Sequence, residues 1–190
     1  MADDKPKVSP SKYWLNFGWE ILKIVIISLA IIIPIRYFLI QPFFVKGASM
    51  EPNFLDGDYL IIDEISYRFE SPERSDVIIF RYPLDPSQFF IKRVIGLPGE
   101  TIKIKDGKIT IYNQETAKEG IVLDESSYVD NVYTPGDLEI TLKSNEYFVL
   151  GDNRRASSDS RKWGALPRKY IIGQAWVRAW PVYRLGVVGE

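Results

Sequence analysis

The chain has 190 residues, and its 24 Lys and Arg against 25 Asp and Glu give a formal net charge of −1. This balance, with no long basic block, makes a nucleic-acid partner a poor fit. The sequence contains neither histidine nor cysteine, which excludes a Ser-His-Asp triad and a thiol nucleophile. A nucleophilic hydrolase made of these residues must pair a hydroxyl with another base, and lysine is the established alternative.

An apolar segment near the N-terminus has the length of a membrane span. Only three charged residues occur between positions 14 and 45, namely Glu20, Lys23 and Arg36. Glu20 and Lys23 stand three residues apart and can partly neutralise each other on a helix. About 20 apolar residues cross a bilayer. We therefore predict an N-terminal segment, residues 1–45, with a single transmembrane helix at about 22–40.

A cleaved export signal is the alternative interpretation of this segment. Its apolar region is usually about 7–15 residues, shorter than the one found here, and Lys46 interrupts the small-x-small pattern that would end at Ala48. An uncleaved anchor is therefore favoured. Cations are more frequent before the apolar stretch than after it: Lys5, Lys7, Lys12 and Lys23 against Arg36 and Lys46. The positive-inside rule then places the N-terminus inside and the rest of the chain outside the cytoplasmic membrane.

Short apolar runs between turn residues predict a mainly β domain over residues 46–190, sheet-like or barrel-like, with short helices only at 64–75 and 154–170. Asp106-Gly107 between alternating Ile residues is a strong hairpin signal. With the polar residues 113–145 that follow, this hairpin predicts a small inserted β region at about 101–145. The predicted strands are Tyr59–Ile65, Val77–Tyr82, Phe89–Ile95, Thr101–Lys105, Lys108–Tyr112, Tyr147–Leu150 and Gln174–Trp180.

Ser49 is the candidate nucleophile because of its setting, although a serine alone is usually a surface or capping residue. Gly47 and Ala48 leave room for a substrate backbone, and Val45 and Met50 supply apolar walls. Ser49 follows position 40 by nine residues, so at ~3.3 Å per extended residue it stays within about 30 Å of the membrane exit. Its target should lie close to the bilayer surface.

Lys92 is the candidate base because its strand is apolar on both faces. Phe90 and Val94 share its face, and Ile91 lies on the other. Burial of such a strand disfavours the ammonium form, so we expect the pKa of Lys92 to fall from ~10.4 to about 7.5. A snorkelling lysine on an edge strand is the competing interpretation. The other lysines of the region, Lys103, Lys105 and Lys108, alternate with isoleucines and predict a solvated face.

A polar loop follows the predicted strand that ends at Leu150. Two Asp–Arg alternations, Asp152 with Arg154 and Asp159 with Arg161, indicate a hydrogen-bonded corner. The corner can be purely structural, or it can position a catalytic loop. Ser157 or Ser158 is placed to orient the lysine nitrogen.

The aromatic residues near the C-terminus have two interpretations. Rings of this size usually fill a core, but they are also enriched at membrane interfaces. The sequence does not separate the two for Trp163, Trp176, Trp180 and Tyr183.

Four segments of the chain, in order, resemble the bacterial type I signal peptidases, which are membrane-bound serine proteases. The resemblance covers about residues 37–182, and the four segments together are far more specific than any one alone. The matching stretches are residues 47–52 with Asp56-Gly57-Asp58, residues 74–80, residues 90–100, and residues 151–161 with Trp163-Gly164.

The resemblance implies Ser49 as nucleophile and Lys92 as a neutral general base, with Ser157 hydrogen-bonded to that lysine. It implies that Asp152, Asn153, Arg154, Asp159 and Arg161 form a polar corner that supports the site. It also implies shallow pockets for small P1 and P3 side chains, walled by Val45, Met50, Phe90 and Ile91. The expected partners are signal peptides of secretory preproteins and the lipid bilayer, and no cofactor or metal is expected.

Three positions depart from the pattern of that family. Gly47 stands where many members have a serine that helps to form the oxyanion hole, so the Ser49 backbone N–H is the donor expected here. Phe90 replaces a common tyrosine, and Arg155 stands where an acidic or amide residue is frequent. Two other functions remain open from the residues alone: a self-cleaving Ser/Lys protease and a non-enzymatic, membrane-anchored β domain that binds peptides.

Overall fold

The computed structural model describes residues 10–38, 41–113, 119–129 and 133–189. The chain separates into two compact units, residues 1–39 and 40–190. The predicted boundaries, 1–45 and 46–190, lie close to this division and stay a prediction. Within the predicted insertion at about 101–145, residues 114–118 and 130–132 lie outside the described residues.

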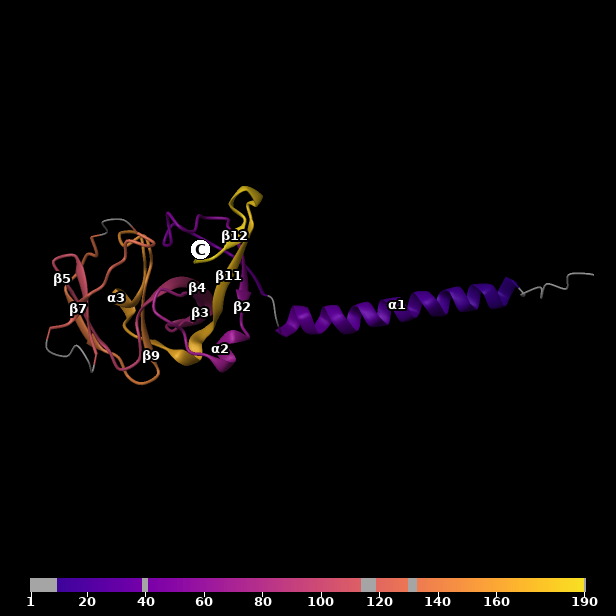
Figure 1. Ribbon diagram of the computed structural model, residues 1–190, viewed down its shortest axis with the longest axis horizontal. Coiled ribbons are helices and arrows are strands. Elements are labelled where there is room, and N and C mark those ends of the chain that lie inside the picture. The colour runs from indigo at the N-terminus through magenta and orange to yellow at the C-terminus, as the bar shows by residue number, and fades with distance from the viewer. Residues whose placement is uncertain (1–9, 39–40, 114–118, 130–132, 190) are drawn as a thin grey trace, which may run out of the picture. The chain divides into compact units, whose positions relative to one another are not determined.

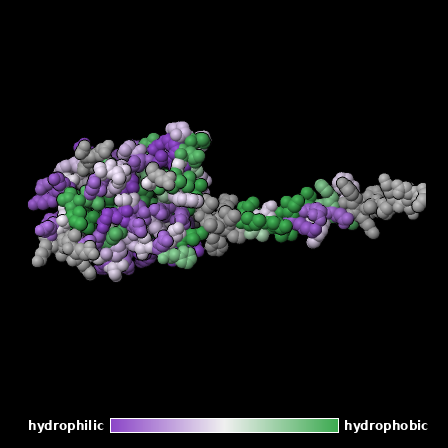
Figure 2. Space-filling model, viewed as in Figure 1, coloured by the Kyte–Doolittle hydropathy of each residue, from purple (hydrophilic) through white to green (hydrophobic). Residues whose placement is uncertain are grey.

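The first unit is a single helix, α1 (Pro10–Phe38), which continues through Pro34. Its stretch Trp14–Ile33 has 20 residues and a mean hydropathy of 1.9, long and apolar enough to cross a membrane. Every side chain of that stretch is exposed within the unit, and Figure 2 shows its apolar surface. An all-round apolar helix without protein packing requires apolar surroundings. The ion pair expected between Glu20 and Lys23 forms at 2.7 Å.

The helix begins well before the span expected at 22–40, and the last two positions of that span lie outside the described residues. The same holds for Lys5 and Lys7, two of the cations that indicate the orientation. The membrane orientation therefore stays a prediction.

The second unit is built on an eight-stranded antiparallel sheet (Figure 1). Its hydrogen-bonded path follows an order in which strands distant in sequence become neighbours. That order is β1 (Gln41–Phe44), β2 (Tyr59–Asp63), β11 (Ile171–Trp180), β3 (Val77–Tyr82), β4 (Asp85–Gly96), β9 (Glu146–Leu150) and β10 (Leu166–Pro167), with β12 (Gly186–Val187) paired to β11. The path through the described strands is open. The mainly β prediction is therefore confirmed, but as a sheet and not as a closed barrel.

A second, four-stranded sheet forms the inserted region. Its order is β7 (Ile121–Val122), β6 (Lys108–Tyr112), β5 (Thr101–Lys105) and β8 (Leu138–Thr141). The β5–β6 hairpin turns at Asp106 and Gly107, whose φ angles of 51° and 78° are those that a two-residue primed turn demands. The alternating isoleucines of β5 and β6 are buried, and Lys105 and Lys108 are exposed, as their alternation predicts.

Several strand predictions match closely, and the differences have local causes. Strands β3, β5 and β6 have the predicted bounds. Strand β4 begins earlier than predicted because its hairpin partner β3 pairs with Asp85, just before Pro86, a residue that argues against a strand. Strands β1, β7, β8, β10 and β12 were not predicted, since two to four residues carry little periodicity. The two segments expected to hold helices contain only short ones, α2 (Ser66–Phe69), α3 (Ser160–Trp163) and the 3₁₀ turn η1 (Arg168–Tyr170); a second 3₁₀ turn, η2, covers Val182–Arg184.

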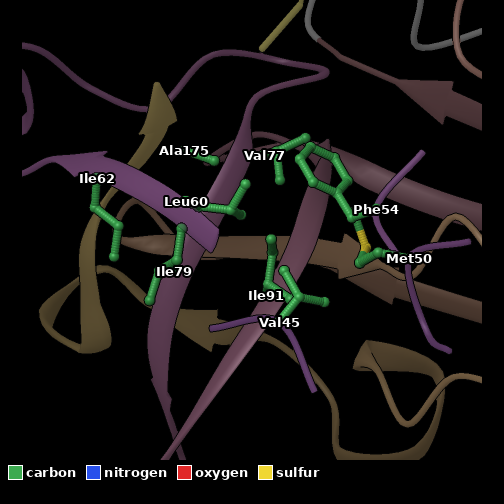
Figure 3. Packing of buried hydrophobic residues seen from close by; sticks show 9 residues of the cluster. All are labelled: Val45, Met50, Phe54, Leu60, Ile62, Val77, Ile79, Ile91 and Ala175. Atoms are coloured by element: carbon green, nitrogen blue, oxygen red, sulfur yellow. The ribbon is translucent and has the colours of Figure 1, made fainter. Parts of the chain in front are cut away.

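Three apolar clusters form the core of this unit. The cluster shown in Figure 3 joins the loop after β1 to strands β2, β3, β4 and β11 through Val45, Met50, Phe54, Leu60, Ile62, Val77, Ile79, Ile91 and Ala175. A second cluster packs Val94 of β4 against Ile78 and Phe80 of β3. Because Ile91 and Val94 belong to different clusters, the segment of β4 around Lys92 is buried on both faces.

The C-terminal aromatic residues do not share one environment. Trp163 is half-buried and packs against the rings of Phe80 and Tyr82 at centroid distances of 5.9 and 6.0 Å. Trp176, Trp180 and Tyr183 are exposed. The core interpretation is therefore wrong for these three residues, and a place at the membrane interface stays a prediction for them.

Candidate active site

Ser49 lies in the loop that joins β1 to β2, and backbone hydrogen bonds close this loop at its base. The Val45 N–H donates to the Asp58 carbonyl at 2.9 Å, and the Gly57 N–H donates to the Val45 carbonyl at 3.0 Å. Met50, the next residue after Ser49, is completely buried in the core cluster of Figure 3. The serine is therefore carried by a backbone that the core holds in place.

Gly47 gives the loop its bend before the serine. Its φ angle is +81°, in the left-handed region that favours glycine, and its N–H donates to Asp56 Oδ1 at 2.7 Å. The N–H of Ser49 itself has no acceptor among the described residues. It is thus free to donate to a developing oxyanion. This is the role expected of it, because Gly47 has no side-chain hydroxyl that could donate instead.

Lys92 lies on β4 opposite Ile78 of β3, and only 3% of its surface is exposed. The fold brings it to Ser49, 43 positions away in the sequence: Lys92 Nζ donates to Ser49 Oγ at 2.8 Å. The same nitrogen donates to the carbonyl of Ile91 at 2.7 Å. The snorkelling interpretation of Lys92 is therefore wrong, because its amino group points into the protein toward a hydroxyl.

Burial lowers the pKa of Lys92 to about 8, although the carboxylates of Asp159 and Asp152 act to raise it. Removing an ammonium group from water disfavours its charged form, and here that effect exceeds the attraction of the two carboxylates. At pH 7 about a tenth of Lys92 is therefore neutral, and a neutral amine can accept a proton from Ser49. The arrangement is a hydroxyl activated by a neighbouring base.

Asp159 and Arg161 form the bidentate pair predicted for the corner. Arg161 Nε donates to Asp159 Oδ1 and Nη2 donates to Oδ2, both at 2.8 Å. Asp159 also accepts the N–H of Gly151 at 3.1 Å. Its own burial acts to raise the pKa of Asp159, but these bonds outweigh it and the pKa is lowered. Asp159 is therefore a fixed negative charge within reach of Lys92.

The side chains of Asp152 and Arg154 do not form an ion pair with each other, contrary to the alternation seen in the sequence. Asp152 accepts two bonds from Arg93, at 2.8 and 2.6 Å, and a third from Asn53 Nδ2 at 2.8 Å. Arg154 forms an ion pair with Glu125 of the inserted region and donates to the Gly151 carbonyl at 3.0 Å. The corner is thus held to β4, to the nucleophile loop and to the insertion at once.

The corner loop contacts the serine loop directly. The N–H of Asn153 donates to the Ser49 carbonyl at 3.1 Å. A Cβ at Gly151 would lie 2.4 Å from that carbonyl oxygen and 2.3 Å from Ser157 Oγ, so only glycine permits this approach. Asn153 and Gly151 therefore set the backbone position of Ser49.

Ser157 does not make the hydrogen bond to Lys92 that the resemblance implies. Its Oγ is buried and lies close to Asp159, whose pKa it helps to lower, and it makes no hydrogen bond to Lys92 within the described residues. Lys92 Nζ uses Ser49 Oγ and the Ile91 carbonyl instead. The backbone carbonyl of Ile91 takes the acceptor position that the resemblance assigns to the Ser157 hydroxyl.

A cleft of about 590 Å³ opens in front of Ser49 and Lys92. Aromatic side chains dominate its wall, and Ser158 lies at its edge; the lining includes Phe43, Phe44, Phe89, Phe90 and Ile91. Two of the four predicted wall residues, Phe90 and Ile91, are thus in place. Val45 and Met50 are not among the lining residues, because both are buried in the core cluster beneath the loop. These two neighbours of Ser49 support the site from the core and do not form its surface.

Sequence reasoning did not assign roles to three residues of this site: Arg93, Asn53 and Glu125. The first is next to Lys92, and its charge in an apolar strand is a signal, since a buried cation needs a partner. The other two carry no local signal. Their importance depends on contacts across 99 positions for Asn53–Asp152 and 29 for Arg154–Glu125.

Comparisons with known proteins show which family the chain resembles. The model of the family described as signal peptidase, peptidase S26, matches residues 18–180. A probable signal peptidase I-2 of Synechocystis sp. is 35% identical over 98% of this chain and 82% of its own length. Signal peptidase I of Leptolyngbya laminosa is 38% identical, covering 90% and 83% of the two chains. Signal peptidase I V of Bacillus subtilis is 35% identical, covering 85% and 95%.

Proposed function

Because the chain belongs to the signal peptidase family, peptidase S26, we propose that Ser49 and Lys92 are the nucleophile and the general base of its reaction. The protein is a serine endopeptidase that cleaves signal peptides from preproteins by a Ser/Lys mechanism. The observation that carries the assignment of the two residues is the 2.8 Å contact between Ser49 Oγ and a buried lysine nitrogen.

The reaction follows from that contact. Neutral Lys92 accepts the hydroxyl proton as Ser49 Oγ attacks the scissile carbonyl, and the oxyanion accepts a hydrogen bond from the free Ser49 N–H. The ammonium then returns its proton to the leaving amine, which releases the mature chain and leaves the signal peptide as an ester on Ser49. Lys92 next deprotonates a water that hydrolyses this ester. The corner residues Asp152, Asn153, Arg154, Asp159 and Arg161 position the two loops and take no proton.

The proposal extends to the membrane. Residues 1–45 serve as the anchor, with an inside N-terminus, and residues 46–190 form the catalytic domain outside the cytoplasmic membrane. The apolar helix with its exposed surface supports the anchor, and the excess of N-terminal cations supports the orientation. The tether holds enzyme and membrane-inserted precursor in one plane, which raises their effective concentration.

The pH dependence of the reaction tests the role of Lys92. We expect kcat/KM to rise with pH through an apparent pKa of about 8, because only the neutral amine accepts the serine proton. Below that pH the lysine is protonated and the rate falls tenfold per unit. The chain has no histidine, so imidazole cannot produce this limb. A rate that climbs steadily to pH 10 and beyond would show that Lys92 is not the base.

The cleft predicts which residues are accepted before the scissile bond. Peptides with alanine at P1 and P3 should be cleaved, whereas a large P1 residue should lower kcat/KM by about tenfold or more. Overfilling an apolar site against Phe90 and Ile91 costs ~1–3 kcal/mol, and displacing the carbonyl from Ser49 adds to the loss. The measurement is kcat/KM for peptides that differ only at P1. Efficient cleavage after Phe or Trp would contradict the proposed specificity.

Deletion of residues 1–40 separates the anchor from the catalytic domain. We expect a large loss in the processing of membrane-inserted precursors and a much smaller loss with short soluble peptides, since only the former depend on the tether. The comparison is made with both substrates in the same detergent or vesicle preparation. Equal losses on both would indicate that the helix is part of the folded catalytic unit.

A further inference from the structure

A second cleft lies beside the catalytic one and is built from the same two loops. The catalytic cleft touches Ser49 of the nucleophile loop and Ser158 of the corner loop. The second cleft, of about 830 Å³, is lined by residues 51–53 and 152–155 of these loops, and by residues 126–129 of the insertion. The hydrogen bond from the Asn153 N–H to the Ser49 carbonyl therefore links a lining residue of the second cleft to a lining residue of the catalytic cleft. The volume of the second cleft lies within the ~300–1,000 Å³ typical of ligand sites.

The two clefts differ in chemistry. Phenylalanines line the catalytic cleft, whereas the second has polar and charged side chains from both loops. A preprotein differs in the same sense across the scissile bond, because the signal segment is apolar and the exported chain is polar. An extended peptide advances ~3.3 Å per residue, so the first three residues after the bond lie within about 10 Å of Ser49. The second cleft, linked to Ser49 through the Asn153 hydrogen bond, provides a space for them.

We propose that the second cleft binds the first residues of the mature chain, and that Arg155 selects an acidic side chain among them. This inference rests on the proposed function and adds a substrate preference to it. Two of the four charged side chains that line the cleft are already compensated: Asp152 by Arg93, and Arg154 by Glu125. Arg155 is exposed and Glu51 is half-buried, and neither has an ion pair within the described residues.

A free cation in a groove that holds a peptide favours an anion at the position that faces it. Because Arg155 is exposed, the effect has the size of a solvent-screened pair, about two- to fivefold in kcat/KM. Glu51 also lines the cleft and has the opposite charge, so it would favour a basic side chain at the position that faces it. A scan of single charges along the mature side resolves the two.

The test uses the full-length protein in detergent micelles and peptides with one constant sequence before the scissile bond. Five neutral residues follow the bond, and each in turn is replaced by Asp or Lys. The enzymes compared are the wild type, Arg155→Gln, Arg155→Glu and the control Lys162→Gln, which removes an exposed cation that lines neither cleft. The measured quantity is the ratio of kcat/KM for the Asp and Lys peptides at each position.

We expect at least one position where the wild type prefers Asp by about two- to fivefold. Arg155→Gln should remove that preference and Arg155→Glu should invert it, while Lys162→Gln leaves it unchanged. High salt should weaken it, because exposed charges are screened. A purely structural role for Arg155 would change all peptides by one common factor, and that result overturns the proposal, as does a ratio near one at every position. Cleavage of the neutral peptide tests the proposed function separately.

Discussion

Replacement of Ser49 by alanine is expected to lower kcat for precursor cleavage by about 10⁴-fold or more. Removing the nucleophile of a serine protease leaves only substrate binding and oxyanion stabilisation, and the loss measured in such enzymes is on the order of 10⁶-fold. The fold should change little, because a single half-buried hydroxyl contributes little to the free energy of unfolding. The measurement is single-turnover processing of a preprotein by the purified variant, together with its thermal unfolding.

Ser158→Ala is the matched control for this experiment. Ser158 lies at the edge of the same cleft and is exposed, but it makes none of the contacts of the Ser49–Lys92 pair. It should retain most of the activity. Substantial turnover by pure Ser49→Ala protein, or an equal loss in both variants, would remove Ser49 as the nucleophile.

Replacement of Lys92 by arginine is expected to be as damaging as its replacement by methionine. Arginine keeps the positive charge, but it stays protonated at any usable pH and cannot accept the serine proton. Both variants should fall by about the same factor as Ser49→Ala, since the two residues act as a unit. Lys105→Arg, on an exposed position of β5, is the control and should be fully active. An active Lys92→Arg enzyme would leave the lysine an electrostatic role only.

Lys92→Met carries a second expected result, which concerns stability. The pKa of Lys92 is about 8 in the folded protein and 10.5 in its ordinary state, so between these pH values the unfolded chain binds more protons than the folded one. The free energy of unfolding of the wild type therefore rises with pH across this window. Below pH 8 it is lower by about 3 kcal/mol than it would be if the folded-state pKa of Lys92 had its ordinary value. Lys92→Met should recover part of this at pH 7 and flatten the dependence. A Met variant less stable than the wild type at pH 7 would contradict a strained, desolvated lysine.

Much of the site was determined by which residues the chain has and where they stand. With no histidine or cysteine, a hydroxyl nucleophile required a lysine, and only Lys92 stood in a strand apolar on both faces. The hairpin at Asp106-Gly107 and the buried isoleucines of β5 and β6 followed from turn chemistry and two-residue alternation. These features depend on local geometry, which a short stretch of sequence specifies.

Only the tertiary structure decided which polar groups meet. Asp152 pairs with Arg93 and Arg154 with Glu125, although Asp152 and Arg154 are close in sequence, because the sheet places β4 and the insertion against the corner loop. In the same way Val45 and Met50 support the site from the core and do not line the cleft, and the Ile91 carbonyl takes the place expected for Ser157 at Lys92. A buried charge requires a partner, but its identity depends on which strands become neighbours, and that is settled by the packing of the whole domain.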